Sequence, residues 1–450
     1  MRARAFATAL LTLAAGCSTH EAGRKTPCPP CAARGAQGAG SASAALGASC
    51  PRCPACRTGP PRRHGLLLGD AAREGIDKAK LDAMVKQAEA EQSSALVILK
   101  NGKLVYERYW KVGADDALIT MSVSKSIASL AVGILLDKQK IKSVEQRVQD
   151  IVPELKDSKV GKTRLVRLLN HTSGLSPRRT KRRPEVGKLL EHATTTPLFT
   201  HPGTRFRYNN NAVDMLALVV WKATGLFLDD FLQTRLFGHL GVVGNYWMKW
   251  ADGHPRVAGE LLIRPVDLAK VGQLVLQGGK WNGKQLVSSA WIERSIQPSQ
   301  KIYPPCGLLW WRHATFHPVL TKRELRTWRS GGVSAKVRRA AKRELLDKEY
   351  PSRDAYLAAL EKLLGGKKQL EKLQKRAARY SLPLYNVIQK GPLSAFSARG
   401  SYGQYLVVVP KTKLVAVRMR LPSDEDYKRR GPALYEYKDF AEHAIGLATR

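Results

Sequence analysis

The 450-residue sequence lacks any apolar run of the roughly 18 residues that a membrane-spanning helix needs, which excludes a multi-span membrane protein. It is also poor in acidic residues, because 37 Asp and Glu stand against 75 Lys and Arg, for a formal net charge of +38. This excess predicts attraction to an anionic partner, which could be nucleic acid, acidic lipid or a cell-wall polymer. Apolar residues make up 44% and charged residues 25%, values near globular averages that argue against wholesale disorder.

Residues 1–17 are typical of a processed export signal, with a basic start at Arg2 and Arg4 followed by a short apolar core. The small residues before Cys17 resemble a bacterial lipoprotein signal, although the usual Leu stands one place earlier than in the commonest pattern. We therefore predict that Cys17 is lipidated and anchors the protein to a membrane of the cell envelope, as a periplasmic or outer-membrane lipoprotein. The alternative is an ordinary secretory signal with an incidental Cys17, and both alternatives export the protein.

Residues 18–65 are rich in Gly, Ala, Ser and Pro and cannot bury enough apolar area to offset their ordering entropy, so we predict a flexible tether. The spacing of its cysteines matches a zinc ribbon, but the run between the two pairs lacks the strand-forming residues that a ribbon packs around its metal. Local or intermolecular disulfides are the favoured interpretation in an oxidising compartment, and we expect neither a metal nor a cofactor. These cysteines are Cys28, Cys31, Cys50, Cys53 and Cys56.

From residue 66 the composition is ordinary, and the pattern predicts strands at both ends with helices between them. Residues 94–109 predict a β-hairpin, since two β-rich runs flank an Asn-Gly turn, and 404–419 predict a second strand pair. Helical patterns occupy much of 140–300, for example 163–170, 211–223 and 264–277. This order predicts an α+β fold, in which an antiparallel sheet flanked by helices carries an inserted helical lobe at about 140–300. We expect 66–450 to form one catalytic unit.

Ser122 and Lys125 stand at i and i+3, just before an apolar segment at 126–136 that predicts a buried helix. This spacing places both side chains on one helix face. A serine hydroxyl is a weak nucleophile unless a base takes its proton, and a lysine whose pKa is lowered by burial can be that base. The helix N-terminus would also favour a developing oxyanion. The pair alone is weak evidence, because Ser-x-x-Lys occurs by chance in many proteins.

Further motifs follow this pair in a characteristic order, namely His171 to Leu175, the triplet Tyr208-Asn209-Asn210 and the segment 264–283. With them the chain resembles the serine beta-lactamase-like hydrolases, which include class C beta-lactamases, D-Ala-D-Ala peptidases, esterases and 6-aminohexanoate-oligomer hydrolases. The resemblance covers most of 75–310 and 393–450.

The resemblance implies roles for the residues of these motifs. Ser122 would form an acyl-enzyme, Lys125 would accept or relay its proton, and Tyr208 would be the second base and protonate the leaving group, with its pKa lowered by Lys125 if it acts as a phenolate. Asn210 would hold Lys125 and the substrate by hydrogen bonds. Each residue also has an ordinary structural alternative as a helix cap or a core aromatic. His171 is better interpreted as structural, because Lys125 already fills the role of the base.

The third motif of this family is usually Lys-Thr-Gly or His-x-Gly, and the matching residues here are Ala398-Arg399-Gly400. The missing cation at the first position disfavours beta-lactamase and carboxylate-gripping peptidase activity, so an esterase or amidase is expected. The resemblance implies that Gly400 lets the substrate approach the backbone and that Ser401 offers a second oxyanion N–H beside that of Ser122. Arg399 could replace the cation, or strand alternation could point it away.

Residues 312–390 form an insertion before the third motif, with twenty Lys and Arg against seven Asp and Glu, a local net charge of +13. Segments 344–360 and 363–380 predict basic amphipathic helices. The insertion could be a lid, an arm that binds an anionic surface, or a solvated helical decoration.

Two functional hypotheses follow from these patterns. The first is an exported serine hydrolase acting on a small-molecule or peptide-like acyl substrate. The second is a catalytically idle fold that binds a membrane or an anionic envelope polymer through the basic insertion. A nucleic-acid partner is not expected, because the chain has no recognition motif with interleaved aromatics and carries an export signal.

Overall fold

An eight-stranded sheet organises the chain in the computed structural model, which describes residues 61–177, 187–380, 382–428, 437 and 439–448. Every neighbouring pair whose register is defined is antiparallel except β2 with β4, which is parallel. In spatial order the strands are β1 (Arg62–Arg63), β2 (Leu66–Leu68), β4 (Lys103–Tyr109), β3 (Ala95–Lys100), β15 (Leu414–Met419), β14 (Gln404–Val409), β13 (Ala395–Gly400) and β10 (Trp311–His313).

The centre of the sheet joins the two ends of the chain. Strand β3 pairs with β15 along its whole length, from Ala95 opposite Met419 to Lys100 opposite Leu414. The hairpin β3–β4 turns at Asn101 and Gly102, whose φ angles of 52° and 78° are the left-handed values that an Asn-Gly turn adopts. The structure therefore confirms the predicted α+β fold, with a sheet built from N- and C-terminal strands.

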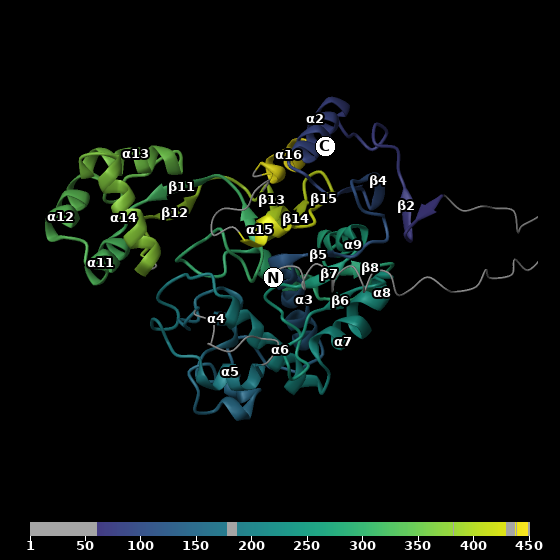
Figure 1. Cartoon of the computed structure of the whole chain (residues 1–450), viewed down its shortest axis with the longest axis horizontal. Coiled ribbons are helices and arrows are strands. Elements are labelled where there is room, and N and C mark those ends of the chain that lie inside the picture. Colours follow the sequence, from purple (N-terminus) through teal and green to yellow (C-terminus); the bar gives the residue numbers. More distant parts are fainter. Residues whose placement is uncertain (1–60, 178–186, 381, 429–436, 438, 449–450) are drawn as a thin grey trace, which may run out of the picture. The chain divides into compact units, whose positions relative to one another are not determined.

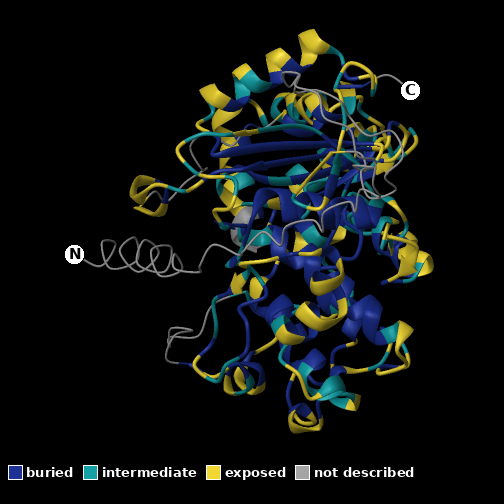
Figure 2. Cartoon of the chain, turned by 90° about the vertical axis from the view of Figure 1, so that its right-hand side faces the viewer, coloured by how far each residue is buried: buried dark blue, intermediate teal, exposed yellow. Residues whose placement is uncertain are grey.

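Helices cover both faces of this sheet. α3 (Ser124–Asp137) and α9 (Pro265–Leu276) lie on one face, while α2 (Lys78–Ala90) and α16 (Phe440–Gly446) lie on the other. The sequence of β3 is apolar from Ala95 to Leu99 because both faces of the strand are covered: Val97 packs toward α3 and α9, whereas Ile98 packs toward α2 and α16. Figure 2 shows the strands as a buried dark-blue layer. Helices α3 and α9 are almost wholly buried, whereas α2 and α16 expose their outer faces.

A helical lobe continues the core on the α3 side of the sheet. Within the range 140–300 expected for this lobe, α9 packs directly on β3, β14 and β15 of the sheet. The helices of the lobe and its flanks are η3 (Val148–Asp150), η4 (Pro153–Leu155), α4 (Leu165–Leu169), α5 (Leu189–Thr195), α6 (Asn210–Thr224), α7 (Leu228–Leu232), η5 (Gln233–Phe237), α8 (Gly238–Leu240) and α10 (Ser289–Ile296). Short strands here are β5 (Leu118–Ile119), β6 (Tyr246–Trp247), β7 (Leu261–Ile263), β8 (Lys280–Trp281) and β9 (Lys284–Gln285).

Among the described residues, the insertion is a subdomain of four helices, which lie between the two strands of a small antiparallel sheet in the sequence (Figure 1). It has a hydrophobic core of its own, which includes the fully buried side chains of Trp328, Tyr356 and Leu360. Its elements are β11 (Phe316–Val319), α11 (Lys322–Ser330), α12 (Ala335–Glu344), α13 (Arg353–Leu364), α14 (Lys367–Tyr380) and β12 (Asn386–Gln389).

The helices predicted at 344–360 and 363–380 are wrong in their limits. α12 ends at Glu344 and α13 begins only at Arg353, because Pro351 cannot continue a helix and the Ser352 side chain caps the next one. The glycines at 365 and 366 have φ angles of 82° and 121°, which are not helical, so α14 starts at Lys367. The two predicted ranges cover parts of three helices, α12, α13 and α14, and α11 was not predicted.

The N-terminal predictions concern residues that the structure leaves undescribed. The export signal at 1–17, the lipidation of Cys17 and the state of the five tether cysteines all lie outside the described residues. Strand β1 falls within the expected tether at 18–65, so regular structure begins slightly earlier than predicted. Residues 63–450 form one compact unit, and in the part of the chain described no helix has the length and apolarity to cross a bilayer.

Gly133→Ala tests the contact between α3 and α10. A Cβ atom at Gly133 would lie 2.2 Å from Cδ1 of Trp291, whose indole N–H donates to the Ser129 carbonyl at 2.9 Å. Alanine favours a helix over glycine by about 1 kcal/mol, but overpacking a core costs about 1–3 kcal/mol, so we expect a net loss of stability. Gly446→Ala in α16 is the control, since a Cβ there meets no atom within 4 Å. Urea denaturation showing Gly133→Ala as stable as the control would contradict this packing.

Candidate active site

Ser122 lies in the short 3-10 turn η2 (Met121–Val123), which leads directly into α3. Met121 has a φ of 48°, a left-handed conformation that a bulky residue rarely adopts and that turns the chain from β5 into the helix. The side chain of Lys125 is almost completely buried, and its Nζ donates to Ser122 Oγ at 2.7 Å. The structure thus brings the side chains of Ser122 and Lys125 into contact, as the spacing predicted.

Burial determines the protonation of Lys125. It lowers the pKa of the amine to about 7, although the opposite charges of Asp214 and Glu260 act to raise it. A lysine with a pKa near 7 is largely a neutral amine in mildly alkaline solution and can accept a proton from the serine hydroxyl.

The Ala258 carbonyl and the Asp214 carboxylate complete the surroundings of Lys125, and the sequence patterns predicted neither of them. Lys125 Nζ also donates a short hydrogen bond to the carbonyl of Ala258, and Ser122 Oγ lies 3.4 Å from the same oxygen. The N–H of Ala258 in turn donates to Asp214 Oδ1 at 2.8 Å. Burial raises the pKa of the Asp214 carboxyl to about 6. The one available signal was that Asp214 is the single acidic residue in the apolar pattern 211–223.

Tyr208 lies immediately before α6, and its hydroxyl is hydrogen-bonded to Ser122. Its ring packs against His171 and Trp311, at centroid distances of 4.5 and 6.2 Å, and Lys125 Nζ lies 5.0 Å from its centroid. Burial raises the pKa of Tyr208 to about 12, although the hydrogen bond with Ser122 acts to lower it, which favours the hydrogen-bonded phenol over the phenolate. Tyr208 is a neutral phenol, suited to donate a proton rather than to remove one.

His171 holds the backbone beside Tyr208. Its side chain is 2% exposed, and its Nδ1 accepts the N–H of Asn209 at 3.3 Å. Burial and the charge of Lys125 lower the pKa of His171 to about 3, so the ring is neutral near pH 7. This geometry fits the structural role expected for His171.

Asn210 does not make the contacts expected for it. It is the exposed first residue of α6, whereas the buried Asn209 accepts the N–H of Ala212 at 3.3 Å and donates to the Leu175 carbonyl at 2.9 Å. Among the described residues Lys125 hydrogen-bonds to Ser122 and the Ala258 carbonyl, and not to Asn210. The side chain that caps α6 is therefore that of Asn209.

The third motif lies against the nucleophile turn. A Cβ atom at Gly400 would stand 2.5 Å from the carbonyl oxygen of Thr120 and 2.9 Å from Met121 Cβ, so only glycine allows this close approach. Ser401 follows at once and opens the turn η6 (Ser401–Gly403). The end of β13 is therefore placed beside Ser122, as an oxyanion hole would require.

Arg399 stands on the strand face opposite to Ala398, because successive side chains alternate. Its guanidinium lies 3.1 Å from Nε2 of His313 and donates to Ser397 Oγ at 3.2 Å. Burial, together with the charge of Arg399, lowers the pKa of His313 to about 3. Arg399 is thus an exposed cation held beside a neutral histidine, and it does not occupy the place of the usual motif cation.

Metal-binding and thiol chemistry find little support among the residues that the structure describes. No group of three or more His, Cys, Asp or Glu side chains there is arranged to hold a metal ion. The free thiol of Cys306 is buried, and burial raises its pKa to about 12, which keeps it protonated and unreactive.

Comparisons with known proteins agree with this geometry. The sequence model of the Beta-lactamase family matches residues 81–421. The chain is 27% identical over 237 residues to a 6-aminohexanoate-dimer hydrolase from Paenarthrobacter ureafaciens, covering 48% of this chain and 59% of that protein. It is 27% identical over 198 residues to lovastatin esterase from Penicillium rubens, covering 37% of this chain and 48% of the esterase.

The chain therefore spans about half the length of the curated relatives it matches. Among solved structures it is similar to a beta-lactamase/D-alanine carboxypeptidase from Pseudomonas syringae, with a TM-score of 0.54 and 15% identity over 83% of this chain and 99% of that one. At this identity the likeness establishes a shared fold.

Asp214→Asn tests the electrostatics of Lys125. If neutral Lys125 is the base, kcat/KM should rise as the pH rises through about 7 in the wild type. The Asp214 carboxylate acts to raise the pKa of Lys125, and asparagine removes this charge while its amide oxygen can still accept from Ala258. We expect the midpoint of the pH profile to move to lower pH.

The matched control is Asp267→Asn, which alters a buried carboxylate paired with Arg264 and Lys270 on α9. It should reduce stability without moving the midpoint. A midpoint that stays in place or moves upward in Asp214→Asn would refute the assignment.

Proposed function

Because the chain belongs to the Beta-lactamase family, we propose that it is a serine hydrolase that forms an acyl-enzyme on Ser122 from an ester or amide substrate. The observation that carries this proposal is the 2.7 Å hydrogen bond from the buried Lys125 amine, with its lowered pKa, to Ser122 Oγ. The catalytically idle alternative offers no reason for a lysine to be buried with its amine directed at a serine.

In the proposed acylation, neutral Lys125 takes the proton of Ser122 as the serine oxygen attacks the substrate carbonyl carbon. The backbone N–H groups of Ser122 and Ser401 would stabilise the oxyanion that forms. The bond to the leaving group then breaks, and the leaving oxygen or nitrogen takes the phenol proton of Tyr208. Lys125 returns its proton to Tyr208, and water releases the acyl group from Ser122.

The substrate is proposed to be an open-chain ester or amide rather than a beta-lactam. Ala398 supplies no cation at the first position of the third motif, and Arg399 is held by His313 and Ser397 on the other strand face. Support also comes from the curated relatives, of which one is named as a hydrolase of 6-aminohexanoate dimer and the other as an esterase of lovastatin.

We further propose that the hydrolase acts in the cell envelope, exported by its signal and anchored through Cys17. The net charge of +38 supports this, since exported proteins meet anionic lipids and wall polymers rather than nucleic acid. Helices α11 to α14 display many of these charges, at exposed residues such as Lys336, Arg339, Lys368 and Lys372.

A hydrolysis panel tests the proposed activity. It contains short acyl esters, linear amides including D-amino-acid peptides, and a chromogenic cephalosporin, each given to the wild type and to Ser122→Ala. We expect turnover of at least one ester or amide, little of the cephalosporin, and a loss of at least about 1,000-fold in Ser122→Ala, since the attacking oxygen is removed. Turnover that survives in Ser122→Ala, or a folded wild type that is inactive throughout, would contradict the proposal.

A further inference from the structure

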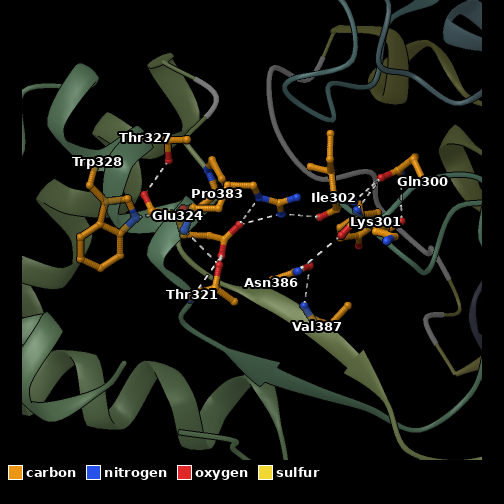
Figure 3. A network of polar contacts seen from close by, with 12 residues as sticks. Gln300, Lys301, Ile302, Thr321, Glu324, Thr327, Trp328, Pro383, Asn386 and Val387 are labelled. Atoms are coloured by element: carbon orange, nitrogen blue, oxygen red, sulfur yellow. Dashed lines mark hydrogen bonds and ion pairs between the residues drawn. The ribbon is translucent and has the colours of Figure 1, made fainter. Parts of the chain in front are cut away.

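The insertion is fastened to a loop next to the active site. Arg323 Nη2, at the start of α11, donates to the carbonyl of Ile302 at 3.3 Å, and Asn386 Nδ2, at the start of β12, donates to the carbonyl of Lys301 at 3.5 Å. Figure 3 shows both bonds reaching from the insertion to the loop 300–303. They begin at two separate elements, so the subdomain holds the loop at two points.

The guanidinium of Arg323 is oriented by a buried carboxylate. Glu324 is fully buried and accepts from the backbone N–H of Thr321, which closes the capping box of α11. The same carboxylate accepts from Arg323 Nε at 2.8 Å and from Nη2 at 2.6 Å. A charge-assisted pair of this kind fixes the plane of the guanidinium and directs it toward Ile302.

The loop 300–303 contacts the segment of Tyr208 through an aromatic stack. Within it, Gln300 Oε1 accepts the N–H groups of Ile302 and Tyr303 at 2.6 and 2.7 Å, so the loop is a tightly bonded turn. The ring of Tyr303 stacks on that of Phe206, with centroids 4.5 Å apart and planes 27° apart. Phe206 stands two residues before Tyr208 in the same segment.

The segment that carries Tyr208 is held from both sides. On the insertion side, Arg205 Nη2 also donates to Ser330 Oγ at 3.0 Å, at the end of α11. On the opposite side, the His171 carbonyl accepts the N–H of Arg207 at 2.8 Å, and the His171 ring packs against Tyr208. Tyr208 therefore sits in a short span whose position depends on the insertion as well as on the body of the fold.

We propose that the insertion positions the proton donor Tyr208 over Ser122, and that Arg323 is a positioning residue for this step. The inference rests on the proposed function. It gives the insertion a role in catalysis, whereas a solvated helical decoration would have none. Proton donation needs hydrogen-bond geometry, and a displacement of about 1 Å can reduce a rate by up to about 100-fold. Losing the Arg323 bond should therefore affect the protonation of the leaving group more than the attack by Ser122.

The test compares two esters of one short acyl group. The p-nitrophenyl ester has a leaving group that departs as an anion without a proton, whereas the methyl ester needs a proton from Tyr208. In Arg323→Ala we expect kcat/KM, which reports acylation, to fall about 10-fold for the methyl ester and less than about twofold for the p-nitrophenyl ester. Arg323→Lys keeps one donor and should restore part of the difference.

The matched control is Arg343→Ala, because Arg343 makes the same pair with its neighbour, with Nη2 2.6 Å from Glu344 Oε1 at the exposed end of α12. It should leave both esters unchanged. Equal losses for the two esters in Arg323→Ala, no loss for either, or the same selectivity in Arg343→Ala would overturn the proposal.

A second variant keeps the test decisive if Arg323→Ala does not fold. Phe206→Leu removes the Tyr303 stack from the other side and should show the same selective loss for the methyl ester. Unselective loss or no loss in this variant overturns the proposal. The two hypotheses fail in different ways, since a wild type without Ser122-dependent hydrolysis refutes the proposed function, whereas an active wild type whose ester selectivity is insensitive to Arg323 and Phe206 refutes only the positioning role.

Discussion

The candidate site depends on one interaction, the contact of the buried Lys125 amine with the Ser122 hydroxyl. Removing Lys125 from water disfavours its charged form, and this is what makes an amine with an ordinary pKa of 10.5 a base near neutral pH. The Ala258 carbonyl and the Asp214 carboxylate moderate this cost by holding the amine in place and by partly offsetting its charge. Without this burial, Lys125 would be charged near neutral pH and could not accept the proton of the Ser122 hydroxyl.

The fold supplies this burial by bringing distant segments to one point. The turn η2 carries Ser122 and α3 carries Lys125 under the sheet, α6 brings Asp214, and the end of β13 packs against the turn at Met121 through Gly400. At the centre of the sheet that supports them, β3 from the N-terminal part of the chain pairs with the last strand, β15. The site is therefore a property of the whole unit, and the insertion extends it by bracing the segment of Tyr208.

Sequence reasoning succeeded where a local pattern carries the information. The Asn-Gly hairpin follows from turn chemistry, and the closeness of Ser122 and Lys125 follows from helical spacing. The sequence patterns did not predict the raised pKa of Tyr208. Burial by residues that are distant in the sequence sets this pKa, and a linear sequence does not show such burial. The contact of Lys125 with the Ala258 carbonyl could not be predicted, because every residue has a backbone carbonyl and its type does not show which one meets a distant side chain. The limits of the insertion helices could have been predicted from Pro351, Gly365 and Gly366, because these residues interrupt helices.

The central claim is that Ser122 is a nucleophile activated by Lys125. Its most direct test is to measure the rate at which a fluorophosphonate labels the full-length protein, with the modified residue located by peptide mass spectrometry. The account predicts a single adduct on Ser122, formed at a rate that rises as the pH rises through about 7 and falls sharply in Lys125→Ala. Labelling at another residue, or equal labelling of Ser122 in a folded Lys125→Ala variant, would contradict it.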